Sequence, residues 1–145
     1  MKNQVVTITR KIEFDAAHRV VEHESKCKYL HGHRYVLEVS FSAPKLDSVG
    51  RVIDFGLVKD IVKSWIDENF DHTAILYEKD KELGEAIAKL TNQKIYYLNS
   101  NPTAENIGLH LLEDILPKLF SDMEIKIESL KLYETPNCSV TICSN

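Results

Sequence analysis

The sequence has little cysteine and no long apolar run. Its three cysteines are an odd number, which does not suit a disulfide framework, and free thiols are typical of a reducing compartment. The N-terminal stretch alternates polar and apolar residues, whereas a signal peptide or a membrane span needs a continuous apolar segment. We therefore expect a cytoplasmic protein with no membrane partner.

Basic residues are also few, and they form no block along the chain. Lysine and arginine number 18 against 22 aspartates and glutamates, which gives a formal net charge of −4. Because a nucleic-acid-binding surface needs a basic stripe, we expect no nucleic acid partner. No repeat, low-complexity tract or Gly/Ser-rich linker divides the 145 residues, and 43 % hydrophobic content is sufficient for one core. The prediction is one domain, residues 1–145.

Two segments have the two-residue period of half-buried strands. Apolar residues take even positions in residues 6–14 and odd positions in residues 35–41. These phases define the side of each strand that faces the core. We expect the two strands to be antiparallel neighbours, joined by a loop over residues 19–30.

Two amphipathic helices are predicted. Asp54 provides an N-cap for the first helix, whose apolar residues recur three and four apart and which ends near Asn69. The second helix begins at Pro102 or Thr103, and Pro117 should strain or shorten its last turn. Two shorter elements are expected between them: a helix over residues 85–90 and a strand over residues 95–98.

The C-terminal segment predicts two more strands. Apolar residues change from odd to even positions between Ile127 and Leu130, which indicates a β-bulge in a strand that ends at Glu134. A turn over residues 135–137 leads into a last strand over residues 138–142. Strand pairs alternating with two main helices predict an α+β domain, in which the helices cover one face of an antiparallel four-stranded sheet.

Three histidines gather at one end of the predicted strand pair. His31 and His33 are two residues apart on a strand, so both imidazoles point to the same side. His18 shares the inward phase of the preceding strand, and antiparallel pairing brings it beside them. Three nitrogen ligands with a free fourth position are typical of a catalytic zinc ion. We therefore predict a Zn²⁺ site formed by His18, His31 and His33.

Cys27 leaves two interpretations of this site open. As a fourth ligand it would close a structural zinc site. As a free thiol beside an open site it would be a base or a nucleophile, because a nearby cation favours the thiolate. His23 in the loop and His110 on the second helix are assigned no role. Cys138 and Cys143 are expected to be packed thiols on the last strand.

Carboxylates supply further candidates. Asp71 directly precedes His72, and such a pair either orients an imidazole for proton transfer or simply stands where a helix ends. Glu134 is in an inward phase, where its carboxylate either accepts two N–H groups of a ligand or reaches water at the strand end. Glu105 lies in the first turn of a helix, where it complements the helix dipole.

Six short motifs follow one another in order between residues 14 and 135. They are Phe14-Asp15-Ala16-Ala17-His18, Lys26-Cys27 with Leu30-His31-Gly32-His33, Val52-Ile53-Asp54-Phe55, Asp71-His72, Pro102-Thr103-Ala104-Glu105-Asn106 and Glu134-Thr135. Together they resemble the 6-pyruvoyltetrahydropterin synthase and 6-carboxytetrahydropterin synthase family. The interval of three residues between Cys27 and His31 resembles the bacterial 6-carboxytetrahydropterin synthase branch.

The resemblance implies a fold and a set of residue roles. The fold is the tunnelling fold, in which trimers close their sheets into a barrel and pair into hexamers, so that the active sites of a homo-oligomer lie between subunits. The implied roles are zinc ligation by His18, His31 and His33, general base catalysis by Cys27, a proton relay by Asp71 and His72 from a neighbouring subunit, pterin anchoring by Glu134 and substrate binding by Thr103 and Glu105.

The implied activity is that of a zinc-dependent lyase. It converts 7,8-dihydroneopterin triphosphate to 6-carboxy-5,6,7,8-tetrahydropterin, with release of acetaldehyde and triphosphate, on the route to queuosine. Two alternatives stay open: a 6-pyruvoyltetrahydropterin synthase, which only eliminates triphosphate, and a non-catalytic pterin-binding module with a structural zinc. Arg19, Lys26 and Lys28 are candidate cations for the triphosphate. The segment between His72 and Pro102 is longer than the compact bacterial pattern, which leaves the exact product open.

Overall fold

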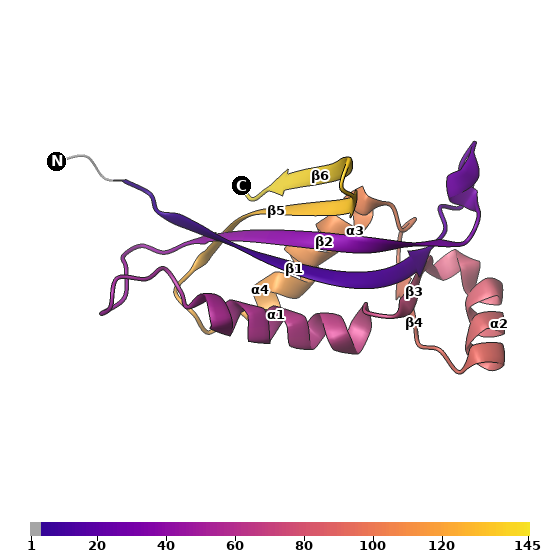
Figure 1. The fold of residues 1–145 in the computed structure, drawn as a ribbon, viewed down its shortest axis with the longest axis horizontal. Helices are drawn as coiled ribbons and strands as arrows, with labels where there is room; N and C mark the ends of the chain where they lie inside the picture. Colours follow the sequence, from indigo (N-terminus) through magenta and orange to yellow (C-terminus); the bar gives the residue numbers. More distant parts are fainter. Residues whose placement is uncertain (1–3) are drawn as a thin grey trace.

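The architecture is one twisted sheet with helices against it (Figure 1). The computed structural model describes residues 4–145, so residues 1–3 of the predicted domain lie outside the described residues. Within the described range six strands form the sheet in the spatial order β4-β3-β1-β2-β5-β6. The strands are β1 (Thr7–His18), β2 (His31–Ser42), β3 (Thr73–Tyr77), β4 (Ile95–Leu98), β5 (Lys126–Thr135) and β6 (Cys138–Cys143).

The sheet is mixed. Strand β1 pairs antiparallel with β2, β2 with β5, and β5 with β6. Strand β3 pairs parallel with β1, and β4 pairs parallel with β3. The prediction of a four-stranded antiparallel sheet is therefore wrong, because two further strands are parallel. The α+β class and the four antiparallel strands within the larger sheet are confirmed. Both additional strands come from the long segment between His72 and Pro102.

Strand β3 was not predicted because its pattern does not alternate. It reads Thr-Ala-Ile-Leu-Tyr, and its first four residues are buried. A short strand with both faces covered has a continuous apolar pattern, which periodicity alone does not distinguish from a helical segment. The predicted strand at Ile95–Leu98 is confirmed as β4, and α2, at Lys81–Thr91, is longer than the predicted helix over residues 85–90. Helix α2 is the crossover that two parallel strands require.

Two main helical segments lie along the four antiparallel strands. Helix α1 (Phe55–Asn69) begins after Asp54, whose carboxylate accepts a hydrogen bond from the backbone N–H of Leu57 (3.0 Å), so the predicted cap is confirmed. In Figure 1, α1 runs below β1, while the second main helix passes obliquely behind the strands, from α3 (Ala104–His110) near β2 and β5 to α4 (Leu116–Leu119) between β1 and α1. Two 3₁₀ turns, η1 (Lys26–Lys28) and η2 (Glu78–Asp80), complete the connections.

The second main helix is interrupted before its end. A π-helical turn at Leu111–Ile115 separates α3 from α4, and the N–H of Leu116 donates to the carbonyl of Leu111. Pro117 has no N–H, and in a regular helix its ring would clash with the carbonyl four residues earlier. The wider turn directly before Pro117 accommodates the ring. The strain expected at Pro117 is thus taken up by a π turn within a helix that continues to Leu119.

The core lies between the sheet and these helices. Phe14 pairs with Tyr35 across β1 and β2, and Ile12 pairs with Leu37. All four side chains are buried, which confirms the predicted phases of both strands. The helices contribute a matching apolar face: Val58, Val62, Ile66, Ile107, Leu111 and Leu116. The inward side of β1 and β2 is therefore fixed along their whole length, up to the end that carries the histidines.

A β-bulge distorts β5. The register of β2 against β5 shifts between Ser40 and Phe41, and Glu128 is the extra residue on β5. This confirms the bulge predicted between Ile127 and Leu130. The bulge explains why apolar side chains change phase along one strand and still face the same core.

The segment that contains β3, α2 and β4 is tied to the end of β1. Arg19 follows His18 directly, and its guanidinium donates to both carboxylate oxygens of Asp80, at 2.6 and 2.5 Å. Asp80 is only 8 % exposed, so this bidentate pair satisfies a carboxylate that has little access to water. Arg19, a candidate cation for the triphosphate, is therefore engaged within the chain.

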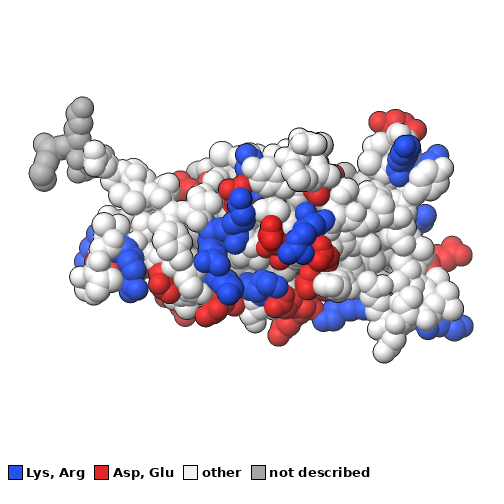
Figure 2. Space-filling model, in the orientation of Figure 1, with Lys and Arg blue, Asp and Glu red and all other residues white. Residues whose placement is uncertain are grey.

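The molecular surface carries charges of both signs close together. Figure 2 shows Lys and Arg side chains next to Asp and Glu over the face in view. Across the strands Lys11 pairs with Glu38, and Glu38 with Lys131, a row of alternating charge that favours strand pairing. In the part of the chain that the structure describes, no helix is long and apolar enough to cross a bilayer.

Candidate metal centre and active site

Three imidazoles meet where β1 ends and β2 begins. His18 pairs with His31, and Ala16 pairs with His33, so the antiparallel register brings the rings together. One ring nitrogen of each lies within 4.8 Å of the other two, and Nε2 of His18 is 3.2 Å from Nε2 of His31. The three histidines are therefore positioned to hold one metal ion.

Backbone carbonyls select the tautomer of two of these rings. Nδ1 of His18 lies 2.7 Å from the carbonyl oxygen of Pro102, and Nδ1 of His31 lies 2.7 Å from that of Tyr29. Because a carbonyl only accepts, each Nδ1–H donates and each Nε2 keeps a lone pair. The two Nε2 atoms face one another as acceptors. Nε2 of His33 is buried without a hydrogen-bond partner.

Burial favours the neutral form of His18 and His33. Desolvation lowers the pKa of His18 to about 4, against the opposing effect of its hydrogen bond to Pro102, and the nearby His31 and His33 lower the pKa further. Burial also lowers the pKa of His33, and the charge of Glu134 opposes this shift. A neutral imidazole binds a metal cation, whereas a protonated one does not. Three imidazole nitrogens around one point, one of them a buried atom without a partner, fit a divalent metal ion.

The carboxylate of Glu134 approaches the same point from β5. Its Oε1 is 3.9 Å from Nε2 of His18, and its Oε2 is 3.9 Å from Nε2 of His33. A register shift between β5 and β6 leaves Glu134 without a partner on β6. Its side chain is 25 % exposed, so it stands at the rim between the histidines and solvent.

A pocket of about 470 Å³ gathers most of the other candidates. Cys27, Thr103, Glu105 and Glu134 all line it. Thr103 caps α3, where its Oγ1 accepts a hydrogen bond from the N–H of Asn106 (3.1 Å). Glu105 stands in the first turn of α3, where its charge complements the helix dipole. Residues from a loop, a helix start and a strand end thus border one space, and Glu134 connects that space to the histidines.

Cys27 is a free thiol of this pocket. It lies in the η1 turn, and its carbonyl accepts the N–H of Val20 (2.8 Å) across the loop between β1 and β2. Among residues 4–145, the group of side chains close enough to share one ion consists of the three histidines and does not include Cys27. His23 and Cys138 line the same pocket although the sequence assigns them no role in it. The placement of His23 and Cys138 depends on loop and strand-end geometry, which no local motif specifies. Cys138 and Cys143 are both exposed, so the expectation of packed thiols on the last strand is wrong.

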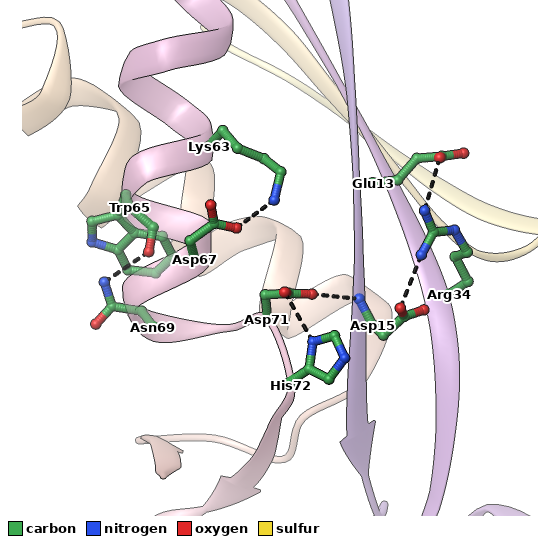
Figure 3. Close-up of polar contacts among 9 residues, drawn as sticks. All are labelled: Glu13, Asp15, Arg34, Lys63, Trp65, Asp67, Asn69, Asp71 and His72. Carbon is green, nitrogen blue, oxygen red and sulfur yellow. Dashed lines mark hydrogen bonds and ion pairs between the residues drawn. The ribbon is translucent and has the colours of Figure 1, made fainter.

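Asp71 and His72 form a connected pair elsewhere (Figure 3). Asp71 accepts hydrogen bonds from the backbone N–H of Asp15 (3.0 Å) and from Nδ1 of His72 (2.9 Å). Burial opposes ionisation of Asp71, but these donors outweigh it and lower its pKa. His72 has a left-handed backbone (φ 59°), and it lines a second pocket, of about 410 Å³, with Gly32 and Arg34. One chain therefore does not bring His72 to the pocket of Cys27.

Tyr35 is a residue of the site that sequence analysis missed. It is 0 % exposed, stacks on Phe14 and faces the edges of the His18 and His33 rings. Its hydroxyl is buried without a hydrogen-bond partner. Burial, and then the charge of Glu134, raises the pKa of this phenol, so it stays a proton donor. The sequence signal that points to Tyr35 is its place in the inward phase of β2, because a tyrosine buried there needs a hydrogen-bond partner for its hydroxyl.

His110 belongs to a separate network in which every member is paired. Its Nδ1 lies 2.9 Å from the carboxylate of Asp114, and its Nε2 lies 2.6 Å from the hydroxyl of Tyr96. The carboxylate accepts from Nδ1–H, so Nε2 accepts from the tyrosine hydroxyl. This chain of hydrogen bonds connects β4 to the second main helix, and it accounts for His110 as a structural residue.

The comparison with protein families agrees with this geometry. The family model described as 6-pyruvoyl tetrahydropterin synthase matches residues 7–145, a range that contains the three histidines, the η1 loop and Glu134. The chain belongs to the 6-pyruvoyl tetrahydropterin synthase family. The resemblance inferred from the six motifs is thereby confirmed.

Relatives within the family carry a more specific name. A 6-carboxy-5,6,7,8-tetrahydropterin synthase of Rickettsia conorii is 59 % identical over 138 residues, which cover 95 % of this chain and 100 % of the relative. The enzyme of that name from Haemophilus influenzae is 36 % identical over 135 residues, covering 89 % of this chain and 92 % of its own length.

Solved structures share the fold. An uncharacterized protein of Wolinella succinogenes superposes with a TM-score of 0.82 at 21 % identity, covering 99 % of this chain and 100 % of the other. The 6-pyruvoyl tetrahydropterin synthase of Caenorhabditis elegans gives a TM-score of 0.65 at 25 % identity, covering 100 % and 99 %. The overall fold of this chain is therefore shared with these solved structures.

The cluster of His18, His31 and His33 makes a direct prediction. Replacing His18, His31 or His33 by alanine removes one of three nitrogen donors, so the affinity for Zn²⁺ should fall by more than about 100-fold, beyond the loss typical of a group that only supports a ligand. His110→Ala is the matched control and should retain the metal. Metal content of gel-filtered protein, measured by mass spectrometry after zinc loading, tests this. Stoichiometric zinc in any of the three variants would contradict the assignment.

Tyr35 and Tyr96 should respond oppositely to loss of the hydroxyl. Tyr35→Phe removes an unpaired buried group, so the free energy of unfolding of the metal-free protein should stay equal or rise by up to about 1 kcal/mol. Tyr96→Phe removes a hydroxyl that is paired with His110, so the free energy of unfolding should fall by about 0.5–1.5 kcal/mol. Urea denaturation measures both. Equal destabilisation by the two changes would mean that the Tyr35 hydroxyl has a partner in the folded protein.

Proposed function

We propose that the protein is a 6-carboxy-5,6,7,8-tetrahydropterin synthase. In this proposal it is a lyase that converts 7,8-dihydroneopterin triphosphate to 6-carboxy-5,6,7,8-tetrahydropterin and releases acetaldehyde and triphosphate. The observation that carries the proposal is the convergence of three imidazole nitrogens beside a pocket that contains the thiol of Cys27 and the carboxylate of Glu134. The name shared by relatives at 55–59 % identity supports the carboxy product.

Glu134 is the group proposed to recognise the pterin. A pterin ring presents an amino group and a ring N–H side by side, and one carboxylate accepts both in a bidentate manner. Thr103 and Glu105 line the same pocket and are proposed to contribute to substrate binding. Lys26 and Lys28 flank Cys27 in the η1 turn and remain the candidate cations for the triphosphate.

His18, His31 and His33 are proposed to hold Zn²⁺. When bound, zinc supplies Lewis-acid stabilisation of negative charge that develops on the substrate beside it. The protein contributes orientation, because the carbonyls of Pro102 and Tyr29 hold two of the rings with Nε2 lone pairs directed at the site. The ligands therefore need no change of tautomer to receive the ion.

Cys27 is proposed as the general base that removes a proton from a substrate carbon, because a neighbouring cation favours its thiolate. Asp71 holds Nδ1 of His72 and leaves Nε2 available to move a proton. Since this pair does not share a pocket with Cys27 in one chain, we assign it to the site of a neighbouring subunit. In this proposal the active site is complete only in a homo-oligomer, a trimer or a hexamer.

Three broader assignments belong to the proposal. Residues 1–145 act as one domain, which is consistent with a family match over residues 7–145. The free cysteines suit the cytoplasm, where thiols stay reduced. The product enters the route to 7-deazaguanine nucleosides such as queuosine.

The reaction itself distinguishes the two synthase activities. Zinc-loaded protein incubated with 7,8-dihydroneopterin triphosphate should release acetaldehyde and triphosphate in equal amounts, because the carboxy product requires cleavage of a side-chain carbon–carbon bond. The measurement is trapped aldehyde together with released triphosphate. Triphosphate without aldehyde would instead assign the 6-pyruvoyl reaction.

Cys27→Ala should retain stoichiometric zinc and lose turnover by about 10²–10⁴-fold, the contribution typical of a positioned general base. Cys143→Ala, at an exposed thiol on β6, is the matched control and should keep both zinc and turnover. Zinc loss from Cys27→Ala would favour the structural site in which Cys27 is the fourth ligand.

Mixed oligomers test the assignment of His72 to a neighbouring subunit. Cys27→Ala and His72→Ala oligomers should each be inactive, but equal co-expression should restore about a quarter of the native turnover, because sites between one subunit of each kind can be intact. The measurement is turnover of the co-purified mixture. If Cys27 and His72 act within one subunit, mixing will restore nothing.

A further inference from the structure

The loop that carries Cys27 has no hydrophobic anchor of its own. In residues 19–30 every side chain is exposed or half-buried, and in Figure 1 this loop projects away from the sheet where β1 ends and β2 begins. A segment with few buried apolar contacts opens easily unless polar contacts hold it. The place of the Cys27 thiol therefore depends on the hydrogen bonds that fix this loop.

The first anchor of the loop is the ion pair of Arg19 with Asp80. The guanidinium donates to both carboxylate oxygens, at 2.6 and 2.5 Å. Asp80 is a buried residue that directly precedes α2. A bidentate pair between an arginine and a carboxylate fixes orientation as well as distance. Because Arg19 directly follows His18, this contact holds the loop at its first residue.

The second anchor is the carboxamide of Asn101. Its Oδ1 accepts a hydrogen bond from the backbone N–H of Val21 (2.9 Å), and its Nδ2 donates to the carbonyl of Val21 (2.7 Å). One side chain thus pairs with both backbone groups of one residue, as a neighbouring strand would. The backbone carbonyl of Asn101 accepts in turn from Nδ2 of Asn106 in α3 (2.9 Å). The loop is therefore held by a residue that is itself fixed to a helix.

A backbone hydrogen bond connects these two anchors to Cys27. Val20 lies between the anchored residues Arg19 and Val21, and its N–H donates to the carbonyl of Cys27 (2.8 Å). Val20 and Cys27 also line the same pocket, together with Thr103 at the start of α3. A shift of Val20 would therefore move Cys27 relative to the opposite wall of the pocket.

Both anchors come from the segment that contains β3, α2 and β4. Asp80 precedes α2, and Asn101 follows β4. Helix α2 packs closely on β4, because a side chain in place of Gly84 would overlap the phenol of Tyr97. Strand β3 joins the main sheet beside the last residues of β1. The two anchors therefore belong to one packed unit that is attached to the strand from which the loop departs.

We propose that Asp80 and Asn101 are positioning residues for Cys27. They hold the start of the loop between β1 and β2, and the hydrogen bond from Val20 passes this constraint on to Cys27. A general base has to stay within hydrogen-bond reach of the proton that it removes, so a small displacement lowers turnover strongly. The placement of Cys27 depends on contacts within the chain, and only its effect on turnover rests on the proposed function.

Reactivity of the Cys27 thiol tests the placement without any turnover. Alkylation of the zinc-loaded protein by iodoacetamide is followed by peptide mass spectrometry, with the exposed Cys143 as internal reference. Asn101→Ala should raise the alkylation rate of Cys27 about 2- to 10-fold, the factor that loss of hydrogen bonds of ordinary strength allows. Asn101→Asp keeps the size of the side chain but sets an oxygen against the carbonyl of Val21, so it should raise the rate as well.

Asp80→Asn should have the same effect, because its amide offers one oxygen acceptor to the two N–H donors of Arg19. Asn99→Ala and Glu82→Gln are the matched controls. Both side chains are exposed, Asn99 two residues before Asn101 and Glu82 in the first turn of α2, so these variants should keep the native alkylation rate. A native rate at the loop thiol in Asp80→Asn and in both Asn101 variants would overturn the proposal.

A double-mutant cycle distinguishes positioning from a general loss of stability. Asn101→Ala should lower kcat about 10- to 100-fold with zinc content unchanged, because a displaced base loses most of its contribution. In a Cys27→Ala background the same change should cause no further loss, since a residue that acts through Cys27 then has nothing to position. A further loss of equal size in that background would mean that Asn101 acts independently of Cys27, and it would overturn the proposal.

The alkylation and turnover measurements together separate this inference from the proposed function. Faster alkylation of Cys27 in the Asp80 and Asn101 variants of a protein that shows no turnover on 7,8-dihydroneopterin triphosphate would leave the positioning role intact and reject the proposed function. Native alkylation rates in those variants of an active protein would reject the positioning role alone.

Discussion

The hydrogen-bond register between β1 and β2 is the constraint on which the site depends. Side chains alternate between the faces of a strand, so a slip by one residue would move every inward side chain to the outer face. The pairing of Phe14 with Tyr35 stacks two buried rings, and the same register sets His18 opposite His31. The buried Phe14–Tyr35 pair thus fixes the position of the His18–His31 pair at the end of the two strands. The histidine cluster therefore continues the inward pattern of the core along the same two strands.

The segments next to the strands then couple the metal site to the pocket. The carbonyl of Pro102, which orients His18, lies two residues before the start of α3. Thr103 and Glu105, at the start of the same helix, form part of the wall of the Cys27 pocket. One helix start therefore orients His18 and forms part of the wall of the Cys27 pocket. A displacement of α3 would disturb both, which gives the packing of this helix against the sheet a direct effect on the site.

Local patterns are sufficient to predict much of this arrangement. The inward phases of β1 and β2, the Asp54 cap and the bulge at Glu128 follow from periodicity and capping within single segments. Features that depend on packing between distant segments cannot be predicted from such local patterns. Strand β3 is covered on both faces, so its sequence carries no alternation. The pocket that His72 lines depends on how α1 leads into β3, and the unpaired hydroxyl of Tyr35 depends on neighbours from several strands. No window of sequence contains these contacts.

The buried polar atoms that have no hydrogen-bond partner also indicate where this fold gives up stability. Among the described residues, the buried side-chain polar atoms without a hydrogen-bond partner are Nε2 of His33 and the hydroxyl of Tyr35, two residues apart on β2. Folded proteins pair almost all such atoms, because an unpaired one is destabilising. Close to the histidines the chain does pair a buried polar group. Arg19, which follows His18 directly, donates to both carboxylate oxygens of Asp80. The two unpaired atoms are therefore confined to the start of β2, at His33 and Tyr35. Unpaired buried polar atoms that are limited to one place are typical of a functional site, where the missing partner comes from outside the chain.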